Sequence, residues 1–307
     1  MQGEAADGYA LAVASGKGGV GKTTTAINLG AALAEDGFDV AVVDLDLGMA
    51  NLAQMVGLRE PTATVHDVLA GRDPLDAACH EARGLTVVPG AIELGLFAET
   101  DPAAIENFVG RLRSRFEVVV LDVGAGLNDD ITAAVDAADG VLLVTTAELH
   151  SLTDASKTGE LVERLSVPVV GAVITGTGEG TFDDVEEVAT ALGATGSVTV
   201  SVPADQAVQE SVRRGLPVVF DDESAPAATA YRRLAASLET ALDWGDGADP
   251  TGGFEWVDPE DGARMDDEPA PVMEVPLETL IEEAGLTDDA EADRSRMLDR
   301  VRSWVGR

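Results

Sequence analysis

The residues with the clearest chemistry lie in one continuous run near the start of the chain. Residues 15–24 read SGKGGVGKTT and fit G-x-x-x-x-G-K-[ST], a pattern whose glycines let backbone N–H groups approach phosphate oxygens. Lys22 is placed to neutralise the β- and γ-phosphates, and Thr23 to offer its hydroxyl to a bridging Mg²⁺. The predicted phosphate contacts are Gly16, Lys17, Gly18, Gly19, Val20, Gly21, Lys22, Thr23 and Thr24.

Such a loop binds phosphate when a strand leads into it and a helix leaves it. Residues 9–14 form a short apolar run, which predicts a buried strand, and residues 24–35 carry apolar side chains at helical spacing. The helix would direct the partial positive charge of its N-terminus at the phosphates. We therefore interpret the glycine run as a nucleotide-binding loop and not as an ordinary turn.

One residue makes this loop more specific than the general pattern. Lys17 directly follows the first glycine, and residues 17–23 resemble the signature K-G-G-x-G-K-[ST] of the deviant Walker A ATPases, the MinD/ParA family. In that family the signature lysine reaches across a dimer to the partner's nucleotide. The resemblance implies an ATP-bound homodimer in which Lys17 and Lys22 both act catalytically, and the alternative is a solvated loop lysine. Among the family's branches, the chain looks like a MinD of the halophilic archaeal type.

Two acidic residues follow the second predicted strand, residues 39–45. Asp44 and Asp46 stand at its carboxyl end, the edge at which doubly wound sheets bind ligands. With Asn51 they match the family's first switch, D-x-D followed by asparagine. The resemblance implies that Asp46 orients the attacking water and that Asp44 supports the Mg²⁺ shell. The alternative is a strand end that carries solvated acids.

A third acidic residue follows the apolar run 118–121. This is the pattern of a Walker B strand, whose carboxylate at Asp122 would hold Mg²⁺ through water. Residues 122–126 resemble the family's second switch, D-x-P-A-G, with Gly124 in place of proline, so we expect a more mobile loop. The resemblance places the N–H of Gly126 at the γ-phosphate.

The adenine side of the site is less well specified by the sequence. Thr175 and Gly176 stand where relatives carry an Asn-Arg pair that helps to recognise adenine. Residues 203–205, in contrast, resemble the loop that lines the adenine in the family, and this resemblance implies a contact from Pro203. The resemblance covers roughly residues 8–243. It therefore specifies phosphate binding better than base recognition.

The net charge limits the possible partners. The chain carries 56 Asp and Glu against 20 Lys and Arg, a formal net charge of −36 with a pI near 4.1. We interpret this as a halophilic surface that concentrated salt screens; the alternative is a protein of ordinary salt that avoids nucleic acid. In either case nucleic acid is not expected as a partner. The only paired arginines of the domain are Arg213 with Arg214 and Arg232 with Arg233.

Cysteine content and hydropathy exclude further classes. The single cysteine, Cys79, excludes a disulfide framework and cannot by itself hold zinc or an iron–sulfur cluster, so the family's cluster-carrying branches are poorly supported. No apolar run reaches the length of a membrane-spanning helix, and residues 1–8 lack the features of a signal peptide. We expect a cytoplasmic protein, and we interpret His66 and His80 as ordinary histidines without a metal.

The sequence predicts three segments. Residues 1–244 are expected to form one α/β domain, a P-loop NTPase with a doubly wound, mainly parallel sheet and helices on both faces. Residues 245–293 are rich in Asp, Glu, Gly and Pro, which is typical of an acidic disordered linker. Residues 294–307 carry five arginines and an apolar face, which predicts a short amphipathic helix. That helix could contact the inner face of the cell membrane, a partner or its own domain.

The function that follows is slow, Mg²⁺-dependent ATP hydrolysis coupled to dimerisation. Family resemblance implies a switch that positions the division site, a surface apparatus or a similar cargo, with a protein partner that activates the ATPase or is positioned by it. Two alternatives remain open at this point. One is a ParA-type ATPase that partitions DNA, and the other is a metabolic enzyme on the related fold, such as an amidoligase, for which no additional substrate domain is visible.

Overall fold

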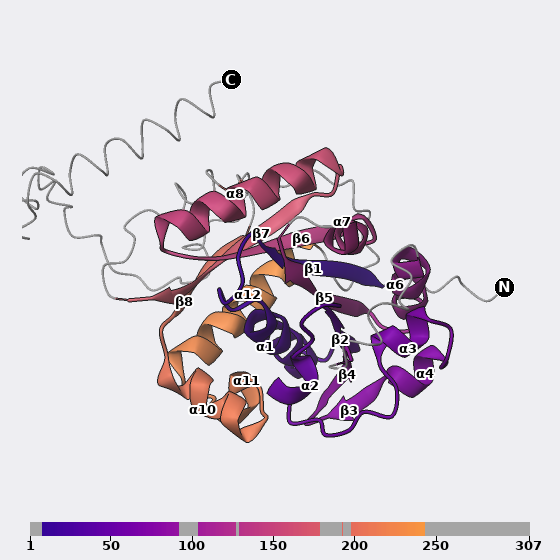
Figure 1. Ribbon diagram of the computed structural model, residues 1–307. Helices are drawn as coiled ribbons and strands as arrows, with labels where there is room; N and C mark the ends of the chain where they lie inside the picture. The colour runs from indigo at the N-terminus through magenta and orange to yellow at the C-terminus, as the bar shows by residue number, and fades with distance from the viewer. Residues whose placement is uncertain (1–7, 92–103, 127–128, 179–191, 193–197, 243–307) are drawn as a thin grey trace, which may run out of the picture. The chain divides into compact units, whose positions relative to one another are not determined.

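An eight-stranded sheet organises the computed structural model, which describes residues 8–91, 104–126, 129–178, 192 and 198–242 (Figure 1). The strand order is β3-β4-β2-β5-β1-β6-β7-β8, and every pair is parallel except β3 with β4 at one edge. The strands are β1 (Tyr9–Ser15), β2 (Val40–Leu45), β3 (His80–Ala82), β4 (Leu85–Val88), β5 (Val118–Ala125), β6 (Gly140–Thr146), β7 (Val169–Thr177) and β8 (Val198–Pro203).

Helices cover both faces of this sheet (Figure 1). They are α1 (Lys22–Glu35), α2 (Leu52–Met55), α3 (Val65–Leu69), α4 (Leu75–Ala78), α6 (Ile105–Arg113), α7 (Asp129–Asp136), α8 (Leu149–Arg164), α10 (Gln206–Arg214), α11 (Val218–Asp221) and α12 (Pro226–Leu242). Helices α1, α11 and α12 pack together on one face, and α6, α7 and α8 lie on the other. The predicted doubly wound α/β fold is confirmed.

The central strands are apolar on both sides because helices bury both. Strands β1, β2 and β6 are almost completely buried, and valine, leucine and alanine dominate them. Their parallel arrangement brings the carboxyl ends of seven strands to one edge of the sheet. Each predicted site residue lies near the carboxyl end of one of these strands or in the segment that follows it, so the fold places all of them along that edge.

The structure corrects one detail of the sequence interpretation. Strand β5 continues to Ala125, so Gly124 is buried within the strand and is not part of the loop that was expected to be mobile. Helix α8 begins at Leu149, and its second turn packs against the phosphate loop. The acidic segment 245–293 and the basic segment 294–307 lie outside the described residues. Within the described ranges, no helix is long and apolar enough to cross a membrane.

Candidate nucleotide site

The glycine loop joins β1 to α1 through backbone angles that only glycine adopts easily. Gly19 has a φ of 82° and Gly21 a φ of 95°, both in the left-handed region, and Gly21 is the N-cap of α1. A Cβ atom added at Gly18 or Gly19 would meet no neighbour within 4 Å, which leaves space beside the loop for a ligand. This geometry is suited to surrounding a phosphate group with backbone N–H groups.

Gly16 is needed for a different reason that the sequence pattern does not reveal. A Cβ atom at this position would lie 2.1 Å from the carbonyl oxygen of Asp154 in α8. The loop and the second turn of α8 are therefore in direct backbone contact. Gly16 acts by allowing this close packing, in addition to any contact with phosphate.

Lys22 is the first residue of α1, and its side chain is buried, with 8% of its surface exposed. Burial lowers the pKa of Lys22, and the negative charges of Asp122 and Asp46 oppose that change. The ammonium group therefore belongs to the same buried charge cluster as these two carboxylates. A nucleotide phosphate would add a third negative group to the cluster.

Asp122 provides the test of whether Mg²⁺ fits this site. Asp122 is buried, and neither of its carboxylate oxygens forms a hydrogen bond of normal geometry with a described residue, although the Thr23 hydroxyl lies close to it. Burial, followed by the charge of Asp44, raises the pKa of Asp122 to about 8, although the Thr23 hydroxyl and Lys22 favour its ionised form. An unpartnered buried carboxylate beside a threonine hydroxyl fits a hydrated Mg²⁺, which takes hard oxygen ligands and keeps several waters.

Asp44 lies opposite Asp122 on the adjacent strand, but its oxygens already have partners. Its Oδ2 accepts the N–H groups of Asn51 and Leu52, both at 3.0 Å, and its Oδ1 accepts that of Asp46 at 3.2 Å. Burial raises the pKa of Asp44 to about 6, and these backbone hydrogen bonds oppose the rise. Asp44 thus holds both ends of the 46–52 segment, and it can support a cation through its charge.

Asp46 follows β2 and is half-buried. Its Oδ1 accepts the N–H of Met49 at 3.1 Å, and a Cβ at Gly124 would lie 3.3 Å from the same oxygen. The proline of the family pattern would therefore crowd Asp46 in this arrangement, whereas glycine leaves room for its carboxylate. Met49 lies at the tip of the loop with 78% of its surface exposed, and it is the exposed large apolar side chain of the described part of the chain.

His66 holds the same loop from the protein interior. Its Nε2 contacts the carbonyl oxygen of Leu47 at 3.0 Å, and its Nδ1 accepts the N–H of Ala91 at 3.0 Å. His80 likewise contacts the carbonyl oxygen of Ala63. Both histidines are thus bound to backbone groups. In the described ranges, no three His, Cys, Asp or Glu side chains gather closely enough to form a metal site from protein ligands alone.

Lys17 lies apart from the buried cluster and contacts the start of α8. Its Nζ contacts Nε2 of His150 and lies 3.9 Å from a carboxylate oxygen of Glu148, and 41% of its side chain is exposed. Glu148 and His150 are themselves 3.1 Å apart and more exposed still. In the single chain the signature lysine is therefore a surface residue with two exposed partners.

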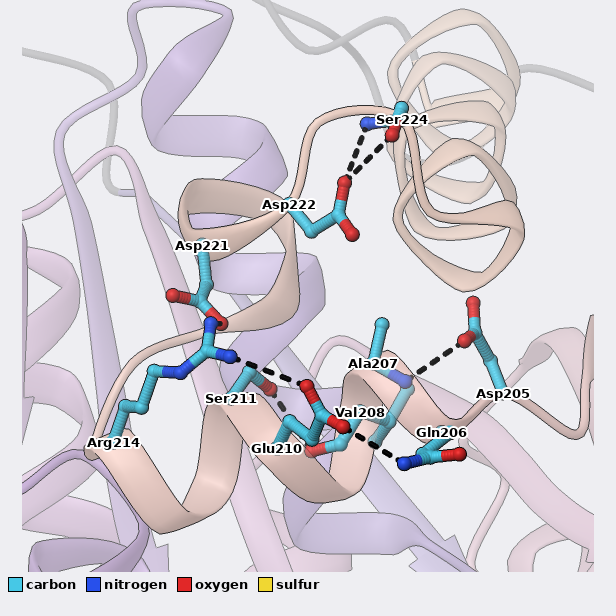
Figure 2. A network of polar contacts seen from close by, with 10 residues as sticks. All are labelled: Asp205, Gln206, Ala207, Val208, Glu210, Ser211, Arg214, Asp221, Asp222 and Ser224. Atoms are coloured by element: carbon cyan, nitrogen blue, oxygen red, sulfur yellow. Dashed lines mark hydrogen bonds and ion pairs between the residues drawn. The ribbon is translucent and has the colours of Figure 1, made fainter.

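Two further residues that the sequence interpretation placed at the nucleotide lie at different distances along the same edge. Gly126 directly follows β5, the strand beside β1, with a φ of 110°, whereas Pro203 ends β8, which β6 and β7 separate from β1. Asp205 fixes the segment after Pro203, because one of its oxygens accepts the N–H of Ala207 at 2.9 Å and the other that of Ala227 at 3.1 Å. It thereby caps both α10, as Figure 2 shows, and α12.

Thr175, at the end of β7, is a contact that sequence reasoning missed. Its hydroxyl lies 2.6 Å from the carbonyl oxygen of Val20 in the phosphate loop and 3.1 Å from that of Thr145 in β6. The available signal was its place at the carboxyl end of a parallel strand. Because the resemblance assigned that position to adenine, no contact with the loop was predicted.

The paired arginines largely serve the fold. Arg214 forms ion pairs with Asp221 at 2.6 Å and Glu210 at 3.2 Å, linking α10 to α11 (Figure 2). Arg232 pairs with Glu35 at 2.7 Å, and it also donates to the carbonyl oxygens of Val219 and Glu223. One member of each pair is therefore already neutralised within the protein.

Comparison with known proteins agrees with this geometry. The CobQ/CobB/MinD/ParA nucleotide binding domain matches residues 11–218. An uncharacterized ATP-binding protein of Methanocaldococcus jannaschii is 36% identical over 231 residues, which cover 75% of this chain and 87% of that protein.

Two solved structures are similar to the described fold. The cell division ATPase MinD of Pyrococcus furiosus has a TM-score of 0.72 and 31% identity, and the match covers 76% of this chain and 99% of that one. The septum site-determining protein MinD of Pyrococcus horikoshii, solved with Mg-ADP, has a TM-score of 0.71 and 29% identity over 78% and 98% of the two chains. The chain therefore belongs to the CobQ/CobB/MinD/ParA family and is a MinD/ParA-type P-loop ATPase that uses ATP and Mg²⁺.

Proposed function

We propose that the chain is a nucleotide switch that dimerises around ATP, hydrolyses it slowly and positions a cellular structure such as the division site or a surface apparatus. The observation that carries this proposal is the position of Lys17. The family signature lysine is exposed at the surface, and among the described residues its side chain is bound by the exposed side chains of Glu148 and His150. Such contacts contribute little free energy, so Lys17 is able to exchange them for a phosphate of a second subunit.

Within one subunit, the described residues divide the work of hydrolysis. The loop N–H groups and Lys22 would hold the β- and γ-phosphates, with the Gly126 N–H at the γ-phosphate. Thr23 and Asp122 would hold Mg²⁺, with Asp44 supporting them by charge, and the ion would neutralise charge that develops on the transferred phosphoryl group. Asp46 would accept a hydrogen bond from the attacking water and so direct its lone pair at phosphorus.

The exposed Met49 supports an interface at the same edge of the sheet. Its side chain is apolar and exposed, while its N–H binds the carboxylate of Asp46. A second subunit or an activating protein that covers Met49 would therefore act directly on the residue proposed to orient water. We expect Met49→Ser to weaken ATP-dependent dimerisation while monomeric ATP binding remains.

The two alternative functions receive less support. Partitioning of DNA would require free cationic groups, but Arg214 and Arg232 are bound to acidic residues of the same chain. No observation in the described ranges favours a metabolic reaction. We therefore retain a single proposed function. In the proposed site, Pro203 forms a wall of the adenine pocket.

The cellular role is tested by imaging. A tagged wild-type chain should show a defined position or pattern in live cells, and Lys22→Ala should be diffuse because it cannot enter the ATP cycle. A diffuse wild-type protein at native expression would contradict a positioning role, although it would leave the ATPase assignment intact.

Peripheral contact with the membrane depends on residues 294–307, outside the described residues. The arginines and the apolar face of this segment support docking on an anionic lipid surface, with two weak helices of a dimer acting together. Liposome sedimentation at native salt with Mg·ATP would compare the full chain with one that ends at Asp293. Equal pelleting of the two proteins would exclude this contact and leave a partner or the ATPase domain as the docking site.

A further inference from the structure

Thr175 contacts the phosphate loop from outside the sequence motif. A threonine hydroxyl has one hydrogen to donate, and here two carbonyl oxygens share it, with Val20 at 2.6 Å as the nearer acceptor and Thr145 at 3.1 Å. The Thr175 methyl group also lies 3.4 Å from the position that a Cβ of Gly21 would take. One side chain therefore binds Val20 and lies beside the next residue of the loop, Gly21.

The rest of the loop fixes the same two residues from other directions. The Val20 side chain is buried in the core, and the carbonyl oxygen of Gly21 accepts the N–H of Thr25 at 2.8 Å as the first hydrogen bond of α1. Between these two anchors lies the peptide group that joins Val20 to Gly21. The hydrogen bond from the Thr175 hydroxyl to the Val20 carbonyl oxygen fixes the direction in which the C=O and N–H of this peptide group point.

The orientation of that peptide group matters because peptide groups are planar and trans. In a trans peptide the C=O of one residue and the N–H of the next point in opposite directions. When Thr175 draws the Val20 C=O toward β7, the Gly21 N–H must point away from β7. A backbone N–H that already points at its ligand stabilises developing charge without any cost of reorganisation.

We propose that Thr175 is a positioning residue for ATP hydrolysis, which orients the Gly21 N–H toward the bound phosphates through the Val20 carbonyl. The inference rests on the assignment of the loop as the nucleotide site. Thr175 does not touch the reacting atoms; it acts through the loop. The competing explanation is that Thr175 only joins β7 to β6 through Thr145 and contributes to stability alone.

The central test is Thr175→Val, which keeps the shape of the side chain and removes the hydroxyl. We expect the affinity for Mg·ATP and the turnover number each to fall about tenfold, less than the 10²- to 10³-fold cost of removing a direct donor. Thr175→Ser restores the hydroxyl and should lie within about twofold of wild type. The matched control is Thr199→Val on the neighbouring strand β8, because the Thr199 hydroxyl has no hydrogen-bond partner among the described residues. It should leave both constants unchanged.

Different outcomes would overturn the nucleotide site and the positioning role of Thr175. If Lys22→Ala binds ATP as tightly as wild type, the nucleotide site itself is wrong. If Lys22→Ala loses binding but Thr175→Val keeps wild-type affinity and turnover at a temperature where it is folded, the positioning role alone is overturned. Equal losses in Thr175→Val and Thr175→Ser would also overturn it, because they would assign the effect to packing of the methyl group.

A measurement on the wild-type protein covers the case in which Thr175→Val does not fold. The amide resonance of Gly21 should shift on addition of Mg²⁺ with a non-hydrolysable ATP analogue, because its N–H would gain a phosphate oxygen as acceptor. The amide of Gly37, at the far end of α1, serves as the reference. A Gly21 resonance that moves no more than that of Gly37 would overturn the proposal.

Discussion

The phosphate side and the base side of this site are built in opposite ways. On the phosphate side, Lys22 and Asp122 are buried beside each other and neither oxygen of Asp122 forms a hydrogen bond of normal geometry with a described residue, so a ligand can complete this cluster. On the side that the resemblance assigns to the base, Thr175 and Asp205 form hydrogen bonds with the backbone of the same chain. The contrast predicts that the free energy of binding comes mainly from phosphates and metal, while this second side maintains the shape of the edge.

The strongest test of this contrast is Lys22→Ala. Removal of the buried cation should lower affinity for Mg·ATP by about 10³-fold, since breaking a buried charged contact costs about 3–5 kcal/mol. Isothermal titration would measure the loss. Lys157→Ala is a suitable control, because Lys157 forms only an exposed pair with Asp154. Retained affinity in Lys22→Ala would refute the site.

Lys17→Ala should separate binding from turnover. We expect monomeric ATP binding to survive, while dimerisation is lost and turnover falls about 10³-fold, the lower end of what cations supplied in trans contribute in other P-loop enzymes. Light scattering and phosphate release would measure the two effects. His150→Ala removes one contact of Lys17 but keeps its charge, and should turn over normally. Equal turnover in Lys17→Ala and wild type would contradict action in trans.

Asp46→Ala should accumulate the ATP-bound dimer, because binding is intact while water is no longer oriented. Light scattering with Mg·ATP would detect the dimer, and phosphate release should fall by about 10²-fold, within the usual contribution of a positioned acid or base. A monomer under these conditions would contradict the role assigned to Asp46.

The raised pKa of Asp122 predicts a pH dependence. In the free protein this carboxyl is largely protonated below about pH 8, whereas Mg²⁺ requires the carboxylate, so affinity for Mg·ATP should rise between pH 6 and 8 and then level off. Protonation also favours the folded state of the free protein, because the pKa is higher folded than unfolded. That stabilisation is complete below about pH 4 and is lost as pH rises through about 8.

Asp122→Asn is the control for both effects. Its affinity for Mg·ATP should be low and should lose the part of the pH dependence that Asp122 contributes. Without ligand, Asp122→Asn should become more stable relative to wild type as pH rises, so its free energy of unfolding minus that of wild type should increase, as measured by urea titration at constant salt. A pH-independent difference between the two proteins would show that Asp122 is already ionised in the folded state.

Substitution of Asp205 should change the stability of the protein and not its affinity for ATP. Asp205→Ala removes a carboxylate that caps two helices, and should lower the free energy of unfolding by about 1–2 kcal/mol, the cost of losing a helix cap. Asp222→Ala is a matched control, since the hydrogen bonds that the structure shows for the Asp222 side chain go to Ser224 in a local turn (Figure 2). A large loss of ATP affinity at unchanged stability would instead give Asp205 a direct role at the base.

The sequence could predict the phosphate side because its residues are contiguous or end apolar strands. Residues 15–24 and Asp122 could be predicted from the local sequence pattern together with the rule that the carboxyl ends of parallel strands lie at the same edge of the sheet. It could not predict the contact of Thr175 with Val20, which joins residues 155 positions apart. Nor could it place Gly16 against Asp154, because that contact depends on how α8 packs. Short elements such as α2, α4, α7, α11 and β3 were missed because packing, and not periodicity, defines them.

His66 gives the first switch a mechanical connection to a distant part of the chain. Because its ring joins the Leu47 carbonyl oxygen to the Ala91 N–H, a displacement of residue 91 would also shift the backbone one residue beyond Asp46. The position of the carboxylate proposed to orient the attacking water therefore depends on an imidazole ring that itself makes no contact with the nucleotide in the proposed site.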